Sequence, residues 1–114
     1  MERENVLLDK SKKFALEIIK LYKGLCSEQK EFVLSKQLLR SGTSIGANAR
    51  EAKRAQSKPD FNAKLHISLK EAEESEYWLE LLYESDYLIK ETFDKIYSDC
   101  EEIIRILVSI LKHS

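Results

Sequence analysis

Apolar side chains recur every three or four residues along most of the chain, which is the spacing that buries one face of an α-helix. The pattern predicts a first helix over residues 7–25, a second over roughly 30–56, a third from Pro59 to Tyr83, and a fourth over about 91–112. No segment alternates apolar and polar residues for long enough to form a strand. Because the connections are short, neighbouring helices should run antiparallel. The pattern therefore predicts an all-α fold, an antiparallel up-down-up-down four-helix bundle.

The breaks in this pattern locate the turns. Gly24 and the letters CSEQ that follow it are typical of the end of a helix. Pro59 suits the first turn of the third helix, and Asp60 favours the positive end of that helix. A chain of 114 residues is long enough for one domain and too short for two comfortable ones. We therefore expect residues 1–114 to form a single four-helix-bundle domain.

Two glycines stand four residues apart on the apolar face of the predicted second helix. Each of Gly42 and Gly46 costs roughly 1 kcal/mol relative to alanine inside a helix, so another interaction must offset the loss. A phosphate-binding loop would need G-x-x-x-x-G-K-[ST] after a strand, and a membrane dimer motif would need an apolar segment without Arg40 and Arg50. The sequence favours a close-packed helix seam formed by Gly42, Gly46 and Ala49.

Apolar residues extend beyond the faces that one bundle would bury. The apolar arc in the last two turns of the fourth helix spans about 200° at 3.6 residues per turn, twice the usual stripe. The third helix also carries apolar side chains away from its main face. Contiguous apolar surface of this kind marks interfaces, so we expect a homo-oligomer. The side chains predicted at its interface are Ile67, Trp78, Leu81, Ile103, Ile106 and Ile110.

Charge is balanced overall, at a formal net −1, but it is strongly uneven along the chain. Residues 36–58 hold six basic residues and one acid, a net charge of +5. Residues 59–86 hold two basic and eight acidic residues, a net charge of −6. A basic stripe along the second helix can follow a phosphate backbone. Its candidate RNA- or DNA-binding residues are Lys36, Arg40, Arg50, Lys53, Arg54 and Lys58.

A second interpretation of the same charges stays open. In a helical hairpin that turns near residue 58, Lys36 lies level with Glu80, and Arg40 lies level with Glu76. The basic and acidic rows would then neutralise each other within or between subunits. Each exposed pair would contribute less than about 1 kcal/mol.

The residues of catalysis and metal binding do not converge in this sequence. Neither His66 nor His113 has a glutamate three residues before it, as di-iron bundles require, and no C-x-x-C or H-E-x-x-H motif occurs. Cys26 and Cys100 lie in apolar helical patterns, which predicts reduced, buried thiols. We expect no catalytic residue, no metal site and no cofactor, and hence a protein that is not an enzyme.

The chain offers nothing that would place it in or across a membrane. Its first residues, MERENVLLDKSKKF, are charged throughout and lack the apolar centre of a signal peptide. Its apolar runs are far shorter than the ~20 residues of a membrane span. We expect a soluble, cytoplasmic protein.

The region around the two glycines also resembles a known family. The sequence is similar to the four-helix-bundle family of the 23S rRNA intervening-sequence proteins, which is related to the accessory variability determinant of diversity-generating retroelements. The letters LKEAEESEYWLELLYESDYL look like that family's third helix, and the resemblance covers about residues 6–112. The residues that match the family's motif are Gln37, Leu38, Arg40, Ser41, Ser44, Ile45, Asn48, Glu51 and Ala52.

The resemblance implies a bundle that assembles as a homopentameric ring without enzymatic activity, with RNA or DNA contact in some members. The retroelement branch is strongly basic, whereas this chain has a net charge of −1. We therefore expect a non-enzymatic, ring-forming interaction or scaffold protein. The alternative is a nucleic-acid-binding accessory protein that uses the basic stripe of the second helix.

Overall fold

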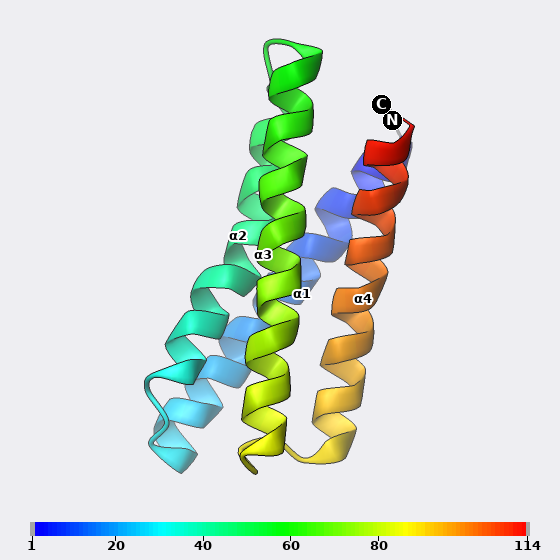
Figure 1. Ribbon diagram of the computed structural model, residues 1–114. Helices are drawn as coiled ribbons and strands as arrows, with labels where there is room; N and C mark the ends of the chain where they lie inside the picture. Colours follow the sequence, from blue (N-terminus) through cyan, green and yellow to red (C-terminus); the bar gives the residue numbers. More distant parts are fainter. Residues whose placement is uncertain (1, 114) are drawn as a thin grey trace.

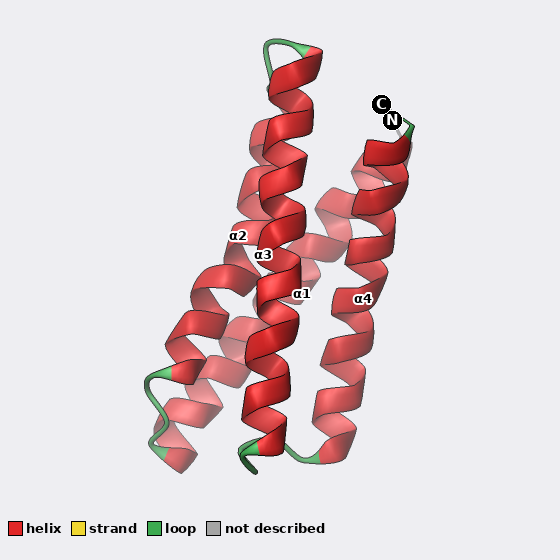
Figure 2. Cartoon of the chain, in the orientation of Figure 1, coloured by secondary structure: helices red, strands yellow, loops and turns green. Residues whose placement is uncertain are grey.

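The computed structural model describes residues 2–113, which form four helices and no strand. Each helix packs against its neighbours in chain order, and the fourth closes the bundle against the first (Figure 1). Short loops join antiparallel neighbours (Figure 2). The all-α four-helix fold predicted from the apolar spacing is confirmed. The helices are α1 (Glu2–Gln29), α2 (Leu34–Lys53), α3 (Lys58–Glu84) and α4 (Lys90–Lys112).

Helix α1 runs through Gly24, so the prediction that this glycine ends the helix was wrong. The helix ends at Gln29, where Lys30 takes a left-handed φ of 55° and the Glu31 N–H donates to the Leu25 carbonyl at 3.0 Å. Leu25 is buried in the core, and its packing outweighs the poor helix propensity of the glycine before it. A lysine therefore takes the conformation that glycine usually adopts at a helix end.

Helix α2 starts at Leu34, four residues later than predicted, because a glutamate holds its first turn. The Glu31 carboxylate accepts hydrogen bonds from the backbone N–H groups of Val33, Leu34 and Ser35, at 3.2, 3.0 and 2.7 Å. Burial by itself would raise the pKa of Glu31, but these N–H donors outweigh it, and the pKa is lowered. The carboxylate thus satisfies donors that an α-helix leaves open at its start.

Helix α3 has defined signals at both ends. Its N-cap is Ser57, whose hydroxyl accepts from the Asp60 N–H at 3.2 Å, and a proline occupies its first turn as predicted. After its last residue Asp86 has a φ of 70°, and the Tyr87 N–H donates to the Leu82 carbonyl at 2.8 Å. This is a Schellman-type end in which aspartate replaces the usual glycine.

The core contains buried serines as well as aliphatic side chains, and three of these serines, Ser41, Ser68 and Ser75, lie where α2 meets α3. The hydroxyls of Ser41 and Ser75 lie 2.8 Å apart, and Ser68 donates to the Ile45 carbonyl at 2.8 Å. These buried hydroxyls all have partners, so their burial is not penalised. The largest fully buried side chains of the core are Phe14, Leu7, Ile18, Leu25, Leu38, Ile45, Leu65, Leu79, Leu82, Ile103, Leu107 and Cys100.

Gly42 and Gly46 lie inside α2 and face α1 at close range. A Cβ atom on Gly42 would stand 3.0 Å from Ile18 Cγ1, and one on Gly46 would stand 3.2 Å from Ser11 Oγ. Ala49, one turn further on, is 3% exposed. The two helices approach each other this closely because these positions carry almost no side chain.

Candidate interaction surfaces

Four cations gather at the end of the bundle where α2 turns into α3. We call this surface the basic tip. In Figure 1 the tip lies at the opposite end from the α1–α2 and α3–α4 turns. All four side chains are exposed, and none forms an ion pair with another residue in the described range 2–113. The residues of the basic tip are Arg50, Lys53, Arg54 and Lys58.

The other two cations of the predicted stripe do not belong to the tip. Lys36 is exposed at the opposite end of α2. Arg40 lies between them, and its guanidinium forms ion pairs with Glu71, at 3.4 Å, and with Glu74. The structure thus divides the stripe into a free tip, a neutralised middle and an isolated lysine.

Charge pairing between α2 and α3 therefore occurs, but not in the predicted register. Arg40 pairs with Glu71 and Glu74 rather than with Glu76, because α2 ends three residues earlier than predicted and the hairpin turns sooner. Glu80, which was expected to lie level with Lys36, instead accepts a hydrogen bond from the Tyr97 hydroxyl at 2.6 Å.

Carboxylates gather on the α3–α4 side, well away from the basic tip. Burial and the negative charges of Glu101, Glu80 and Glu73 raise the pKa of Glu76. Glu76 lies about five helical turns beyond Lys58 along α3. A polyanion at the basic tip would therefore not lie against these acids.

Two of the predicted interface residues belong to the core of the single chain. Ile103 is 1% exposed and Ile110 is 6% exposed, so neither side chain is offered to a partner. Helix α4 packs between α1 and α3, and the two neighbours bury the part of the wide apolar arc that holds Ile103, Leu107 and Ile110, while Val108 stays exposed. Ile106 is half-buried and lies on the wall of a groove beside α1.

The remaining predicted interface residues share one face of α3. Ile67 is 42% exposed, while Trp78 and Leu81 are half-buried. Tyr77, which was not predicted, is 54% exposed and stacks obliquely on Trp78 with ring centroids 5.3 Å apart. At 100° per residue these four side chains fall within an arc of about 100°. We call them the outer α3 face.

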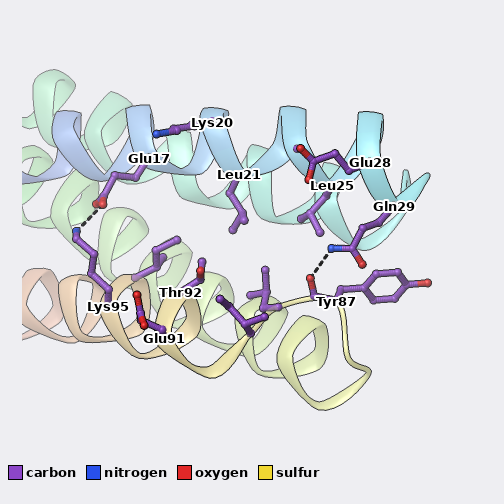
Figure 3. Close-up of a pocket in the computed structure, with 14 residues that line it drawn as sticks. Glu17, Lys20, Leu21, Leu25, Glu28, Gln29, Tyr87, Glu91, Thr92 and Lys95 are labelled. Atoms are coloured by element: carbon purple, nitrogen blue, oxygen red, sulfur yellow. Dashed lines mark hydrogen bonds and ion pairs between the residues drawn. The ribbon is translucent and has the colours of Figure 1, made fainter.

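A groove separates α1 from α4 near the α3–α4 turn (Figure 3). Its volume is about 570 Å³. In Figure 3 the side chains of Leu21 and Leu25 point from α1 towards α4. The Lys95 ammonium donates to Glu17 at 2.6 Å at one end of the groove, and Gln29 Nε2 donates to the Tyr87 carbonyl at 2.8 Å at the other. These two hydrogen bonds hold the two sides of the groove together. The carboxylates of Glu17 and Asp99, which accept hydrogen bonds from Lys95, raise the pKa of the Lys95 ammonium.

Gly24 stands on the α1 wall of this groove, and no residue in the described range 2–113 packs closely over it. A Cβ atom on Gly24 would meet no heavy atom within 4 Å, unlike one on Gly42 or Gly46. Close packing over the glycine itself therefore does not offset its cost of roughly 1 kcal/mol, and the offset comes from Leu25 in the core. The sequence did hold a sign that the helix continues through Gly24, because the apolar spacing of α1 extends past this glycine to Leu25.

The two cysteines have free thiols that differ in burial. Cys100 is buried and donates to the Ala72 carbonyl at 3.3 Å, and burial together with nearby carboxylates raises its thiol pKa. Cys26 is half-buried rather than buried, with its sulfur 3.9 Å from the Ser35 hydroxyl. Within residues 2–113 no group of His, Cys, Asp and Glu side chains is arranged to hold a metal ion. Over the same range no helix is long and apolar enough to cross a membrane.

The fold and its surfaces define a small antiparallel four-helix bundle. Its sequence matches the model of the 23S rRNA-intervening sequence protein family over residues 3–109, so the chain belongs to that family. It is also similar to a crystal structure from Bacteroides thetaiotaomicron, described as a protein with unknown function from the S23 ribosomal protein family. That similarity reaches 58% identity and a TM-score of 0.96 over 96% of this chain and 98% of that one. No curated protein matches the sequence.

Proposed function

We propose that the protein is a homo-oligomeric interaction protein that performs no catalysis, with the oligomer itself as the scaffold. The observation that carries this proposal is the outer α3 face. Exposed Ile67 and Tyr77, together with half-buried Trp78, place apolar and aromatic side chains on one side of α3. Aromatic side chains, tryptophan above all, are enriched at protein interfaces. A ring of five is the assembly that the family resemblance implies.

Sedimentation equilibrium tests the oligomer. The chain has a mass of 13.3 kDa, so an oligomer at micromolar concentration should give a whole-number multiple of that mass. The Tyr77→Asp variant should shift the mass towards that of the monomer. The matched control is Ala47→Asp, an exposed substitution on α2 that lies outside the outer α3 face. A wild-type chain that sediments at 13.3 kDa would refute the proposal.

A second candidate function is RNA or DNA binding through the basic tip. The observation that favours it is the set of four exposed cations without ion-pair partners in residues 2–113. The name of the family, which refers to 23S rRNA, is consistent with such contact. In an oligomer the tip would recur in every subunit, and avidity would strengthen weak phosphate contacts. Such contacts bind phosphates rather than bases, so binding would be sequence-tolerant and sensitive to salt.

Titration of labelled single- and double-stranded RNA and DNA at about 50 mM and 200 mM salt tests this candidate. The Arg50→Gln/Arg54→Gln variant should weaken binding roughly tenfold and reduce its salt dependence. The Lys12→Gln/Lys23→Gln variant removes the same charge from exposed positions on α1 and should bind like the wild type. Equal losses in both variants, or no binding tighter than about 10⁻⁴ M at the lower salt, would discard the candidate.

A further inference from the structure

A carboxylate lies among the four side chains of the outer α3 face. At 100° per residue, the side chain of Glu74 leaves α3 between the directions of Leu81 and Ile67, and Trp78 follows one turn later. The Glu74 side chain is 31% exposed, so water still reaches its carboxylate in the single chain. A partner that covers the outer α3 face would therefore also cover this charge.

One oxygen of Glu74 holds two donors. Its Oε1 atom pairs with Nη2 of the Arg40 guanidinium and accepts a hydrogen bond from the Trp78 indole Nε1 at 3.3 Å. The Nη1 atom of the same guanidinium lies 3.4 Å from Glu71. The planar fork of arginine presents donors to two carboxylates at once, whereas lysine presents one compact ammonium. Arg40 thus neutralises Glu74, while Glu74 anchors Trp78.

The place of Arg40 opposite Glu74 is fixed by the core beneath it. Ser41 and Ser75, the next residue on each helix, are both buried, and their hydroxyls lie 2.8 Å apart. This hydroxyl pair specifies the register of the two helices, because a shift of one helix would break the bond inside the core. The packing of α2 against α3 therefore brings Arg40 and Glu74 together.

Covering the outer α3 face would change the importance of this ion pair. An exposed ion pair contributes little to stability. A carboxylate that a partner removes from water is costly unless it stays paired and hydrogen-bonded. Arg40 and the Trp78 indole supply those partners already in the single chain. An anchored indole also loses less freedom on association, which favours binding.

We infer that Arg40 and Glu74 are positioning residues for self-association. Glu74 fixes the Trp78 indole, and Arg40 neutralises the Glu74 carboxylate when a second copy covers the outer α3 face. The inference rests on the proposed oligomer and deepens it. Loss of Arg40 alone would leave an unpaired carboxylate in the interface, whereas loss of both charges would not.

A cycle of variants tests the ion pair. Sedimentation over a range of concentrations gives the self-association constants of the wild type, Arg40→Gln, Glu74→Gln and the double variant, with helical circular dichroism as the check on folding. Arg40→Gln should weaken association at least about tenfold, because an unpaired carboxylate is then desolvated. Arg40→Gln/Glu74→Gln lacks that carboxylate and should associate more tightly than Arg40→Gln alone. The matched control is Lys64→Gln, which breaks a different ion pair between α2 and α3, the 3.0 Å contact with Glu51, and should associate like the wild type.

A second measurement follows Trp78 without any dependence on association. Trp78 is the only tryptophan of the chain, so its indole N–H gives a single NMR resonance. In a Tyr77→Asp background, in which the chain is expected to be monomeric, Glu74→Ala and Arg40→Gln should shift this resonance. Lys64→Gln should leave it in place.

The outcomes separate this inference from the proposed function. Three results would each overturn the inference and leave the oligomer standing: an Arg40→Gln chain that associates as tightly as the wild type, a double variant as weak as Arg40→Gln, or an indole resonance that Glu74→Ala does not move. A wild type that sediments at 13.3 kDa would overturn both the inference and the proposed oligomer.

Discussion

Gly42 of α2 lies directly against Ile18 of α1. A Cβ atom on Gly42 would stand 3.0 and 3.1 Å from the two γ-carbons of Ile18, and Ile18 is itself fully buried. A β-branched side chain in a filled core cannot turn away, so the added methyl has nowhere to go. The contact sets how closely α1 and α2 approach.

Gly42→Ala should destabilise the protein by about 1 kcal/mol. The overpacking cost of about 1–3 kcal/mol exceeds the gain in helix propensity of roughly 1 kcal/mol. Urea unfolding followed by circular dichroism measures the change. In the double variant with Ile18→Ala the methyl finds room, so the two losses should be less than additive. A Gly42→Ala chain as stable as the wild type would contradict this account of the contact.

Glu31→Gln should destabilise the protein near neutral pH by about 1 kcal/mol, a typical loss for a helix cap. Because the folded-state pKa of Glu31 is lowered, the ionised carboxylate stabilises the native state at pH values above its ordinary 4.5. That contribution is lost as the pH falls through the folded pKa. The stability difference between wild type and variant should therefore shrink in acid. An exposed control, Glu28→Gln, should show little effect, and a difference independent of pH would count against the capping role.

Lys30→Gly should stabilise the protein by about 1 kcal/mol, because glycine adopts a left-handed conformation without the penalty that a side chain incurs. Lys30 has a φ of 55°, and its ammonium makes only a local bond to the Ser27 carbonyl, at 3.0 Å. Thermal unfolding shows whether the variant is more or less stable than the wild type. The same replacement at Lys23, inside α1 and exposed, should instead cost about 1 kcal/mol. Equal effects at the two positions would contradict the assigned end of α1.

The two thiols should react at different rates with a disulfide reagent. Cys100 is buried with a raised thiol pKa, so it should react only after unfolding, while half-buried Cys26 should react in the native protein. We expect the rates to differ at least about tenfold. Cys26→Ser should remove the native-state reaction. Rapid modification of both thiols in the folded protein would show that the core around Cys100 opens readily.

The positions of the four helices could be predicted from the sequence because apolar periodicity is a local property of each segment. The same periodicity places Gly42 and Gly46 on the apolar face of the second helix. Their unfavourable helix propensity then predicts close packing against a neighbouring helix, because that cost needs an offset. Pro59 at the start of α3 follows from its fixed φ and its missing N–H.

The end of α1, the register of the α2–α3 hairpin and the surfaces were decided only by the tertiary structure. Gly24 does not end α1 because Leu25 gains more by packing in the core than the glycine costs. Ile103 and Ile110 are buried because α4 has a neighbour on each side, and Arg40 meets Glu71 and Glu74 because the hairpin turns early. Each of these outcomes depends on where one helix lies relative to another, and the periodicity of a single helix carries no information about that placement.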